Sequence, residues 1–331
     1  MAEKAGSERI GPRGVRQWIK PMLVTALVLG WGLTMFWGEA AHAVEQVAPG
    51  ETPWWVWPFV LFMLTCVLGV LAVLAGIGGS VLFVPIVSGF LPFLHIDFIR
   101  GAGLMVALSG ALAAGPKLIG ENLANIRLAI PISLVASFAS IFGALIGLAL
   151  PTDLVQISLG VVIIGMSGLM VMSKSSTSGK SGPSDPIATM LGISGTYYDP
   201  ETGQSTTWAP RNMLISLVLF SGVGLMAGMF GLGAGWANVP VLNLVMGIPL
   251  KIAVATSYFL LAITDTSAAW IYLSRGALLP IIVIPSVLGI MLGARIGAKI
   301  LPGIRPVVIR RIVIGVLLFA GLRALLRGFG I

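Results

Sequence analysis

The amino-acid sequence predicts an all-α polytopic membrane protein made of two homologous repeats, each containing a helix that is broken at glycines. Hydrophobic residues make up 57% of the 331 residues and charged residues only 10%, whereas soluble domains carry about 25% charged residues. Long apolar runs alternate with short polar connections, and the mean hydropathy is +1.00. A glycine-rich interruption of an apolar run occurs twice, 155 positions apart. A chain of this length suits about nine to eleven membrane crossings.

Four segments are expected in chain order. Residues 1–50 form a basic N-terminus followed by an apolar anchor or signal segment, and residues 51–173 form the first transmembrane repeat. Residues 174–210 form a polar inter-repeat loop rich in Ser, Gly and Pro, and residues 211–331 form the second transmembrane repeat. Within the loop, residues 199–203 are typical of a turn.

The apolar stretch at residues 21–37 has two interpretations. A basic segment precedes it and Ala41-His42-Ala43 follows it, which is the pattern of a cleaved signal peptide. The stretch is also long enough to remain as a first membrane helix. In either case the residues that follow carry Glu39, Glu45 and Glu51 but no Lys or Arg, so we expect them outside the cytoplasm.

The first interruption is Gly76-Ile77-Gly78-Gly79-Ser80, which divides an apolar run covering residues 57–91. A straight helix of that length would measure about 52 Å, against a hydrocarbon core of about 30 Å. Clustered glycines are where such a helix can break. The same device returns as Gly231-Leu232-Gly233-Ala234-Gly235. A proline follows each cluster, and we expect Pro85 and Pro240 to take part in breaking the two helices.

Further matches extend the internal repeat beyond the glycine clusters. Several positions recur at an offset of 155, and a Gly-Ala-x-x-Gly motif near the end of the first half returns near the end of the second. The ordered series indicates a duplication rather than chance. The matching positions are Gly69 with Gly224, Gly78 with Gly233, Pro85 with Pro240, and residues 143–147 with residues 293–297.

The distribution of Lys and Arg decides between two orientations of the repeats. If each broken segment crosses the membrane once, about 12 of the 20 basic residues are cytoplasmic. If each broken segment instead returns to the side on which it began, about 16 are cytoplasmic. The positive-inside tendency favours the second arrangement, in which the two repeats have inverted topologies.

A pair of broken helices in corresponding halves is the best sequence indication of a transporter's binding site. A break frees backbone N–H and C=O groups, which hydrocarbon cannot satisfy. The half-helices beginning near Ser80 and Gly235 would direct N–H groups and positive dipole ends toward a cavity, where an oxyanion supplies acceptors. Asn238 and Ser80 add side-chain donors. The alternative is close helix packing, which also uses small residues, but duplication of the breaks favours a site.

Asp265 is the most informative charged residue, because an intramembrane carboxylate is expensive and indicates function. It lies in an apolar run that also holds several Ser and Thr residues. We expect it to carry a coupling proton or to hydrogen-bond to the second broken helix. The alternative is a carboxylate capped by the neighbouring hydroxyl groups. His95, Asp97 and Arg100, by contrast, fall in a short connection, and we expect them to form a solvated loop.

The glycine-rich break leading to a Val-Pro pair, repeated in the second half as Val239-Pro240, resembles the TauE/SafE sulfite-exporter family. Ala255-Thr256-Ser257 and the Gly-Ala-x-x-Gly motifs at 143–147 and 293–297 share this resemblance, which covers about residues 57–326. The chain departs from the family pattern at Ser80 and Ala234, where longer glycine runs are usual. The resemblance implies export of sulfite or small organosulfonates, without a bound cofactor or an ATPase domain.

Together these observations predict a secondary transporter of the cytoplasmic (inner) membrane that exports a small sulfur oxyanion. Its expected partners are the anion, protons as a candidate coupling ion, and membrane lipid. The net charge of +8 reflects topology and not nucleic-acid binding. We expect no cofactor, metal or catalytic residue. The predicted substrate-binding residues are Gly76, Gly78, Gly79, Ser80, Gly231, Gly233, Gly235, Asn238, Thr256 and Ser257.

Three other classes of function remain as alternatives. An anion channel would use the same glycines, and only saturable, counter-transported flux distinguishes a transporter from it. An intramembrane enzyme is disfavoured because the sequence has no HExxH, no GxSxG and no Cys/His metal cluster. A purely structural membrane subunit leaves the duplicated breaks and Asp265 without a role.

Overall fold

A computed structural model describes most of the chain from Trp55 onward. The described residues are 55–75, 79–91, 94–120, 124–172, 185–190, 192–199, 204–300 and 306–329. The N-terminal anchor or signal segment at 1–50, and with it the choice between cleavage and retention, lies outside the described residues, as do Gly76 and Gly78.

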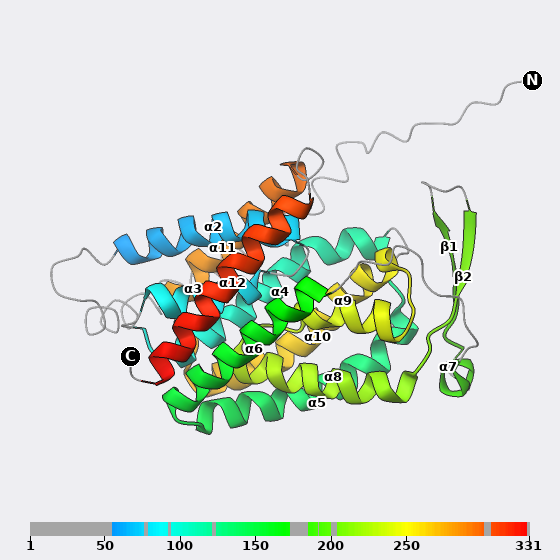
Figure 1. Cartoon of the computed structure of the whole chain (residues 1–331), viewed down its shortest axis with the longest axis horizontal. Coiled ribbons are helices and arrows are strands. Elements are labelled where there is room, and N and C mark those ends of the chain that lie inside the picture. Colours follow the sequence, from blue (N-terminus) through cyan, green and yellow to red (C-terminus); the bar gives the residue numbers. More distant parts are fainter. Residues whose placement is uncertain are drawn as a thin grey trace, which may run out of the picture. The chain divides into compact units, whose positions relative to one another are not determined.

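The described elements are almost all helices, and they follow the same order in both predicted halves: a long helix, a break, a short helix and three long helices (Figure 1). In the first half these are α2 (Val56–Ala75), α3 (Ser80–Phe90), α4 (Ile96–Gly120), α5 (Ile126–Ala149) and α6 (Thr152–Met172). In the second half they are α8 (Met213–Phe230), α9 (Gly235–Pro240) continuing into the π-helical turn η1 (Val241–Val245), α10 (Leu250–Ser274), α11 (Pro280–Ile300) and α12 (Pro306–Gly328).

Several of these helices are long and apolar enough to cross a membrane. Among the described residues, five helices meet both requirements, within α4, α5, α8, α10 and α11. Shorter apolar stretches lie in α2, α3 and α6. The predicted all-α, multi-pass membrane architecture is therefore confirmed.

The predicted polar loop between the halves holds more regular structure than expected. It contains α7 (Pro186–Met190) and an antiparallel hairpin of β1 (Gly195–Asp199) and β2 (Gln204–Trp208). The hairpin strands flank the residues predicted as a turn. Asp185 connects this region to the second half, because its carboxylate accepts hydrogen bonds from the Ile187 amide and from the Met213 amide at the start of α8, both at 2.9 Å.

The two faces of α5 show how this chain reverses the usual distribution of side chains. Four large apolar residues spaced one turn apart are 56–60% exposed, as expected where lipid covers them. The opposite face carries small residues, which are buried against other helices. On α5 most contacts with other helices are therefore made by small side chains, although Leu128 and Ile132 are buried too. The exposed residues are Ile130, Leu134, Phe138 and Phe142.

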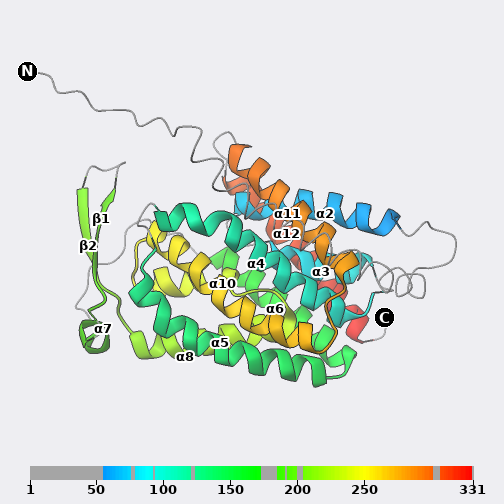
Figure 2. The ribbon, with the colours of Figure 1, turned by 180° about the vertical axis from the view of Figure 1, so that it is seen from behind.

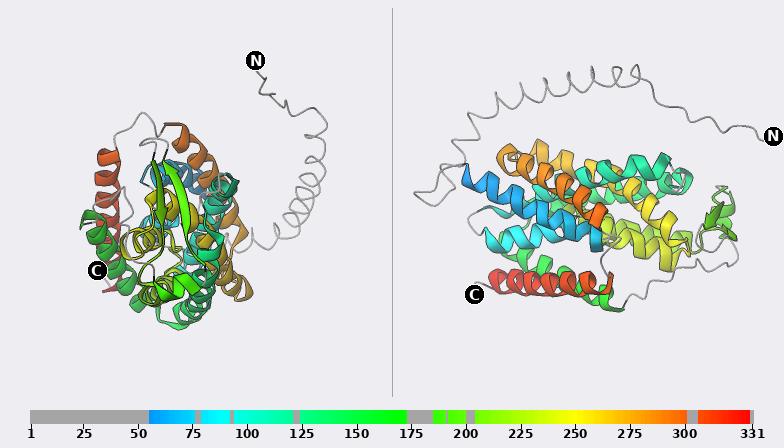
Figure 3. Two further views of the ribbon diagram at one scale, coloured as in Figure 1. Left: turned by 90° about the vertical axis from the view of Figure 1, so that its right-hand side faces the viewer. Right: turned by 90° about the horizontal axis from the view of Figure 1, so that it is seen from above.

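Helices of one half pack mainly against helices of the other. α2 packs along α11 and α5 along α8, so the first helix of each half lies against the fourth element of the other. α4 packs against α10, seen from behind in Figure 2, and α6 packs against α12, seen from above in Figure 3. This reciprocal pattern is the one expected of two repeats related by a two-fold axis.

The paired helices approach so closely that their glycines meet the partner's backbone. A Cβ atom on Gly224 of α8 would lie 2.2 Å from the Ala136 carbonyl oxygen of α5. A Cβ atom on Gly293 of α11 would lie 2.0 Å from the Cys66 carbonyl oxygen of α2. Both glycines belong to the series that predicted the repeat. For them, close packing is the reason that the residue must be glycine.

This packing predicts that Gly224→Ala destabilises the protein by about 1–3 kcal/mol, since the added methyl group overpacks a contact between two backbones. Gly222→Ala on the same helix is the matched control, because a Cβ atom there meets nothing within 4 Å. Thermal unfolding in detergent, followed by size-exclusion chromatography, should show a lower midpoint for the first variant only. Equal midpoints for the two variants would contradict the packing.

Candidate functional site

The second helix break occurs where the sequence predicted it, and the predicted first break falls mostly on residues 76–78, which lie outside the described residues. α2 ends at Ala75 and α3 begins at Ser80, while α8 ends at Phe230 and α9 begins at Gly235. In the second break, Gly231 and Gly233 have φ values of +68° and +65°. Residues with a Cβ rarely adopt this left-handed conformation, so the backbone itself requires glycine at these two positions.

The prolines do not form the breaks. Pro85 lies inside α3, which continues to Phe90, and Pro240 lies where α9 passes into η1. The prediction that these prolines break the helices is therefore wrong for Pro85. Pro240 instead coincides with a change from α-helical to π-helical geometry, because a proline lacks the N–H that an α-helix uses. The interruptions lie at the glycines.

The second broken segment returns to the end from which it started. The Arg211 amide, just before α8, donates to the Met246 carbonyl oxygen at 3.0 Å. The Asn212 side chain also donates to the Val245 carbonyl oxygen, at 3.3 Å. The chain therefore goes out along α8 and comes back through α9 and η1, as in the arrangement that the charge distribution favoured.

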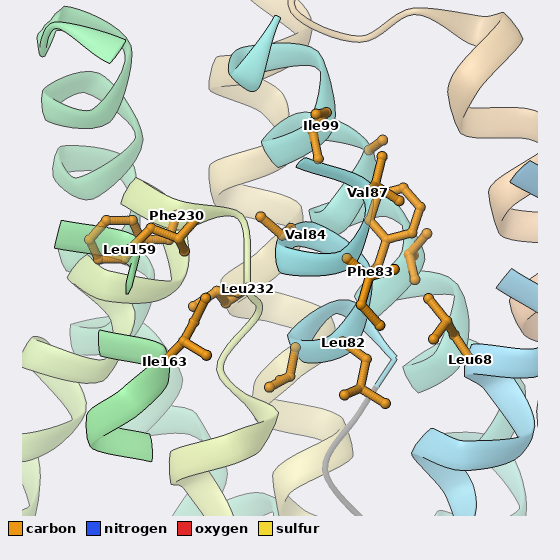
Figure 4. Close-up of a cluster of buried hydrophobic side chains, with 14 of the residues drawn as sticks. Leu68, Leu82, Phe83, Val84, Val87, Ile99, Leu159, Ile163, Phe230 and Leu232 are labelled. Atoms are coloured by element: carbon orange, nitrogen blue, oxygen red, sulfur yellow. The ribbon is translucent and has the colours of Figure 1, made fainter. Parts of the chain in front are cut away.

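The two breaks, about 150 residues apart in sequence, are in direct contact. The Ser80 hydroxyl group at the start of α3 donates a hydrogen bond to the Leu232 carbonyl oxygen. Ser80 is 2% exposed, so the contact is buried. Figure 4 shows the extended chain after Phe230 running beside α3, with Leu232 directed into the same buried apolar cluster as Leu82 and Val84.

The middle of α4 supports both breaks. A Cβ atom on Gly79 would contact the Val106 side chain at 3.4 Å, and one on Gly233 would contact the Ala107 Cβ at 2.8 Å. Gly103, one turn earlier on α4, lies against the Gly231 carbonyl oxygen. Because Val106 and Ala107 lie near the centre of this long helix, the breaks meet deep between its ends.

Asp265 of α10 lies at the same place. It is fully buried, and neither carboxylate oxygen has a hydrogen-bond partner within the described structure. A Cβ atom on Gly233 would lie 2.9 Å from Asp265 Oδ2 and 2.9 Å from Ser80 Oγ. The Ala234 amide faces the carboxylate without meeting hydrogen-bond geometry. The side chains of Asp265 on α10 and Ser80 on α3 therefore lie close to the same point beside Gly233.

Asn238 is a second buried polar group near the break. It is 1% exposed, and its side-chain nitrogen has no partner among the described residues. Its backbone amide donates to the Ala234 carbonyl oxygen at 3.1 Å, which places Asn238 one turn beyond the break. Side chains on a helix lean toward its N-terminus, so we expect this donor on the side of the break.

Thr256 and Ser257 do not join this cluster. Both are buried on α10, but nine residues separate Thr256 from Asp265, a distance of about 13 Å along the helix axis. The Thr256 hydroxyl oxygen accepts a hydrogen bond from the Asn125 amide, at 3.2 Å. Asn125 in turn caps the start of α5. In this structure Thr256 connects α10 to the start of α5, away from the breaks.

The expectation of a solvated loop around Arg100 is wrong, because Arg100 lies on α4 and is 1% exposed. Its guanidinium group pairs with Asp97 on the same helix. His95, which is more than half exposed, contacts the other Asp97 oxygen at 3.3 Å. Asp97 and Arg100 are three residues apart at the edge of an apolar run. The i, i+3 spacing of these opposite charges could have indicated that they pair on a helix.

Arg100 satisfies carbonyl groups that the second break leaves without helical partners. It donates to the Met229 carbonyl oxygen at the end of α8, at 2.8 Å, and to the Gly147 carbonyl oxygen at the end of α5, at 3.0 Å. The Tyr272 hydroxyl group donates to the Gly228 carbonyl oxygen, at 3.0 Å. The last carbonyls of any helix need such partners, and hydrocarbon offers none.

Gly147 makes room for this arrangement. A Cβ atom there would lie 2.8 Å from an Arg100 nitrogen and 2.6 Å from the Met229 carbonyl oxygen. The first glycine of the same motif, Gly143, packs against the backbone of Leu225. The Gly-Ala-x-x-Gly motif of the first half therefore joins α5 to α8 and admits the arginine that holds the end of α8.

A groove on the protein also lies outside the candidate site. An open groove of about 370 Å³ lies between α3 and α12, lined by residues including Ile86, Phe319 and Arg323. Its lining is almost entirely apolar, so it offers few donors to an oxyanion.

Within the part of the chain that the structure describes, no group of three or more His, Cys, Asp or Glu residues could hold a metal ion.

Comparison with known proteins identifies the family of this chain. A family model described as Sulfite exporter TauE/SafE matches residues 61–324, which is most of the chain. The chain belongs to the TauE/SafE family. The resemblance drawn from the glycine breaks and the Gly-Ala-x-x-Gly motifs is therefore confirmed. With its helices long enough to span a bilayer, this TauE/SafE protein is a multi-pass membrane transporter.

The chain is also similar to the Probable membrane transporter protein YunE of Bacillus subtilis (strain 168). It is 23% identical over 248 residues, which cover 73% of this chain and 87% of the relative. No solved structure matches the chain.

Arg100 provides a stability test for this TauE/SafE transporter. Arg100→Met should lower the free energy of unfolding by about 3–5 kcal/mol, because Asp97 and buried carbonyl groups lose their partner. Arg275→Met is the control, since Arg275 is exposed at the end of α10. Arg100→Lys should rescue only part of the loss, because an ammonium group lacks the guanidinium fork. A thermal midpoint for Arg100→Met equal to that of the control would rule out this role.

Proposed function

We propose that this protein is a secondary transporter that exports a small sulfur oxyanion, sulfite or an organosulfonate, with its binding site between the two helix breaks. The observation that carries the proposal is the contact between the breaks at Ser80 and Leu232, against the middle of α4. Two interrupted helices that meet between the ends of long membrane helices are the arrangement in which transporters bind their substrates.

The chemistry of the breaks suits an oxyanion. α3 begins after Gly79 without a side-chain cap on its first amides, and α9 begins after Ala234 in the same way. Uncapped amides at the start of a helix are donors that need acceptors, and the dipole of α3 adds a positive potential. Asn238 supplies a further donor whose nitrogen has no partner among the described residues. Sulfite and sulfonate groups present three oxygen acceptors within a small volume.

The remaining predicted residues take different places in this proposal. Gly79, Gly231, Gly233 and Gly235 form the backbone of the site, with Gly76 and Gly78 as its predicted continuation in the first half. Ser80 and Asn238 supply side-chain donors. Thr256 and Ser257 lie further along α10, so we assign them to the path of the anion and not to its central site.

The paired arrangement of helices suits alternating exposure of such a site. Backbone contacts at Gly224 and Gly293 hold α8 to α5 and α11 to α2. Among the described residues, a hydrogen bond from Ser80 to Leu232 joins the two breaks. We infer that each tightly packed pair moves as a unit and that the contact between the breaks opens and closes.

A channel is the second candidate function, and burial distinguishes it from a transporter. Ser80, Asn238 and Asp265 are each at most 2% exposed. A permanently open pore would leave the groups that bind its ion in water. Their burial favours a transporter that encloses its substrate between openings.

The central site predicts that Gly233→Ala lowers sulfite flux by about tenfold or more, the equivalent of about 1.4 kcal/mol. The added methyl group would contact both Ser80 and Asp265 at 2.9 Å and would force a side chain into positive φ. The measurement is sulfite flux into proteoliposomes containing equal amounts of folded protein. Gly78→Leu and Gly233→Leu should abolish the same flux.

Gly110→Ala on α4 is the control for this series, since a Cβ atom at position 110 meets nothing within 4 Å. Its flux should match that of the wild type. Normal flux in both Leu variants would remove the glycine breaks as the site. Flux that neither saturates nor responds to sulfite on the opposite side of the membrane would favour the channel.

The inverted orientation of the two repeats predicts that the polar segment between them is cytoplasmic. A reporter protein fused after residue 190 should therefore give a cytoplasmic signal. A matched fusion after Gly276, which follows α10, should give a periplasmic signal. A periplasmic signal from the fusion at residue 190 would end the inverted model.

A further inference from the structure

We propose that the anion moves together with one proton carried on the Asp265 carboxyl group, so that the protein is a proton–anion symporter in which the outward anion gradient drives export. This inference rests on the function proposed above and adds the coupling ion to it. The geometry points to it because Asp265 Oδ2 and Ser80 Oγ lie at equal distances, 2.9 Å, from the position of a Cβ atom on Gly233. The carboxyl group is therefore part of the place where the breaks meet.

A negatively charged carboxylate and a negatively charged substrate exclude each other at this place. Two like charges a few ångströms apart repel strongly where protein and lipid replace water. The site at the breaks can therefore bind the anion only while Asp265 is neutral. Asp265 is ionised only when no anion is bound. A neutral carboxyl group also has an O–H group, which can donate a hydrogen bond to the anion. Anion binding and proton binding then support each other.

Other charged groups do not replace the proton as the partner of Asp265. Within the described residues, neither of its oxygens has a hydrogen-bond partner. On α4, Arg100 is engaged by Asp97 and by carbonyl groups. Arg127 on α5 and the α10 residues Lys251 and Arg275 are exposed near the helix ends. Arg211, before α8, contacts Gly247.

The remaining titratable groups on α10 are Tyr258 and Tyr272. Tyr272 is engaged with the end of α8, because its hydroxyl group donates to the Gly228 carbonyl oxygen. Tyr258 packs at the edge of a small apolar cluster with Ala107 and Leu261. Neither tyrosine carries a positive charge in any protonation state, so neither can neutralise Asp265. Among the described side chains none supplies a positive charge to Asp265, and we assign its neutralisation to a proton.

The symport mechanism fixes the signs of two measurable effects. Anion leaving a vesicle takes protons out with it, so the lumen becomes more alkaline. Because the anion requires a protonated Asp265, transport by the wild type falls as the pH rises on both sides. Asp265→Asn has a permanently neutral side chain with an N–H donor, so it should still exchange anion for anion, independently of pH and without moving protons.

The test uses purified full-length protein in proteoliposomes that contain a pH-sensitive dye. The probes are sulfite and methanesulfonate, and methanesulfonate carries no proton of its own near neutral pH. We expect wild-type anion efflux to raise the lumenal pH and wild-type exchange of labelled anion to fall several-fold between pH 6 and pH 8. We expect Asp265→Asn to exchange anion at a constant rate over that range. Asp153→Asn, an exposed residue on α6, is the matched control and should behave as wild type.

Each of the following results would contradict one of these claims. Wild-type anion efflux without a change in lumenal pH overturns the symport mechanism whether or not the variant folds. Exchange by Asp265→Asn that still falls with pH, or a folded variant that exchanges no anion, overturns the role of Asp265. If the wild type moves neither sulfite nor methanesulfonate, the proposed function itself fails.

Discussion

The fold depends on one constraint: a helix that breaks inside a membrane must find new partners for its backbone polar groups. At the second break, Arg100 and Tyr272 supply donors to the last carbonyls of α8. Ser80 supplies a donor to the Leu232 carbonyl oxygen from the other break. Carbonyl groups are thus satisfied by the protein, whereas the first amides of α3 and α9 have no side-chain cap. That imbalance supports the proposed site, because an anion there would supply the missing acceptors.

The same constraint separates two uses of glycine in this chain. Gly224 and Gly293 are small because two helix backbones meet there, and these contacts hold helices of opposite halves together. Gly231 and Gly233 are required by their positive φ values, which turn the chain back from α8. Close packing explains the first pair and backbone conformation the second, so glycines of one repeat series are required for different physical reasons.

The two halves share their arrangement of elements but not their polar groups. At the offset of 155 shared by the glycine clusters and the prolines after them, Ser80 corresponds to Gly235, Asp265 to Gly110 and Arg100 to Ala255. Each of these side chains occurs in one half only. A similar order of elements thus carries a different set of charges and hydroxyl groups in each half, as the proposed coupling through one carboxyl group requires.

The sequence by itself determined the membrane class, the family and the positions of both breaks, because hydropathy and glycine clusters report properties of a local segment. It also singled out Asp265, since a carboxylate in an apolar run is conspicuous whatever surrounds it. Only the tertiary structure decided that Ser80 meets Leu232, that Thr256 lies apart from Asp265, that Pro85 continues its helix and that Arg100 is buried. Those facts depend on contacts between helices far apart in sequence, and the spacing of residues within one helix does not specify which partner it will meet.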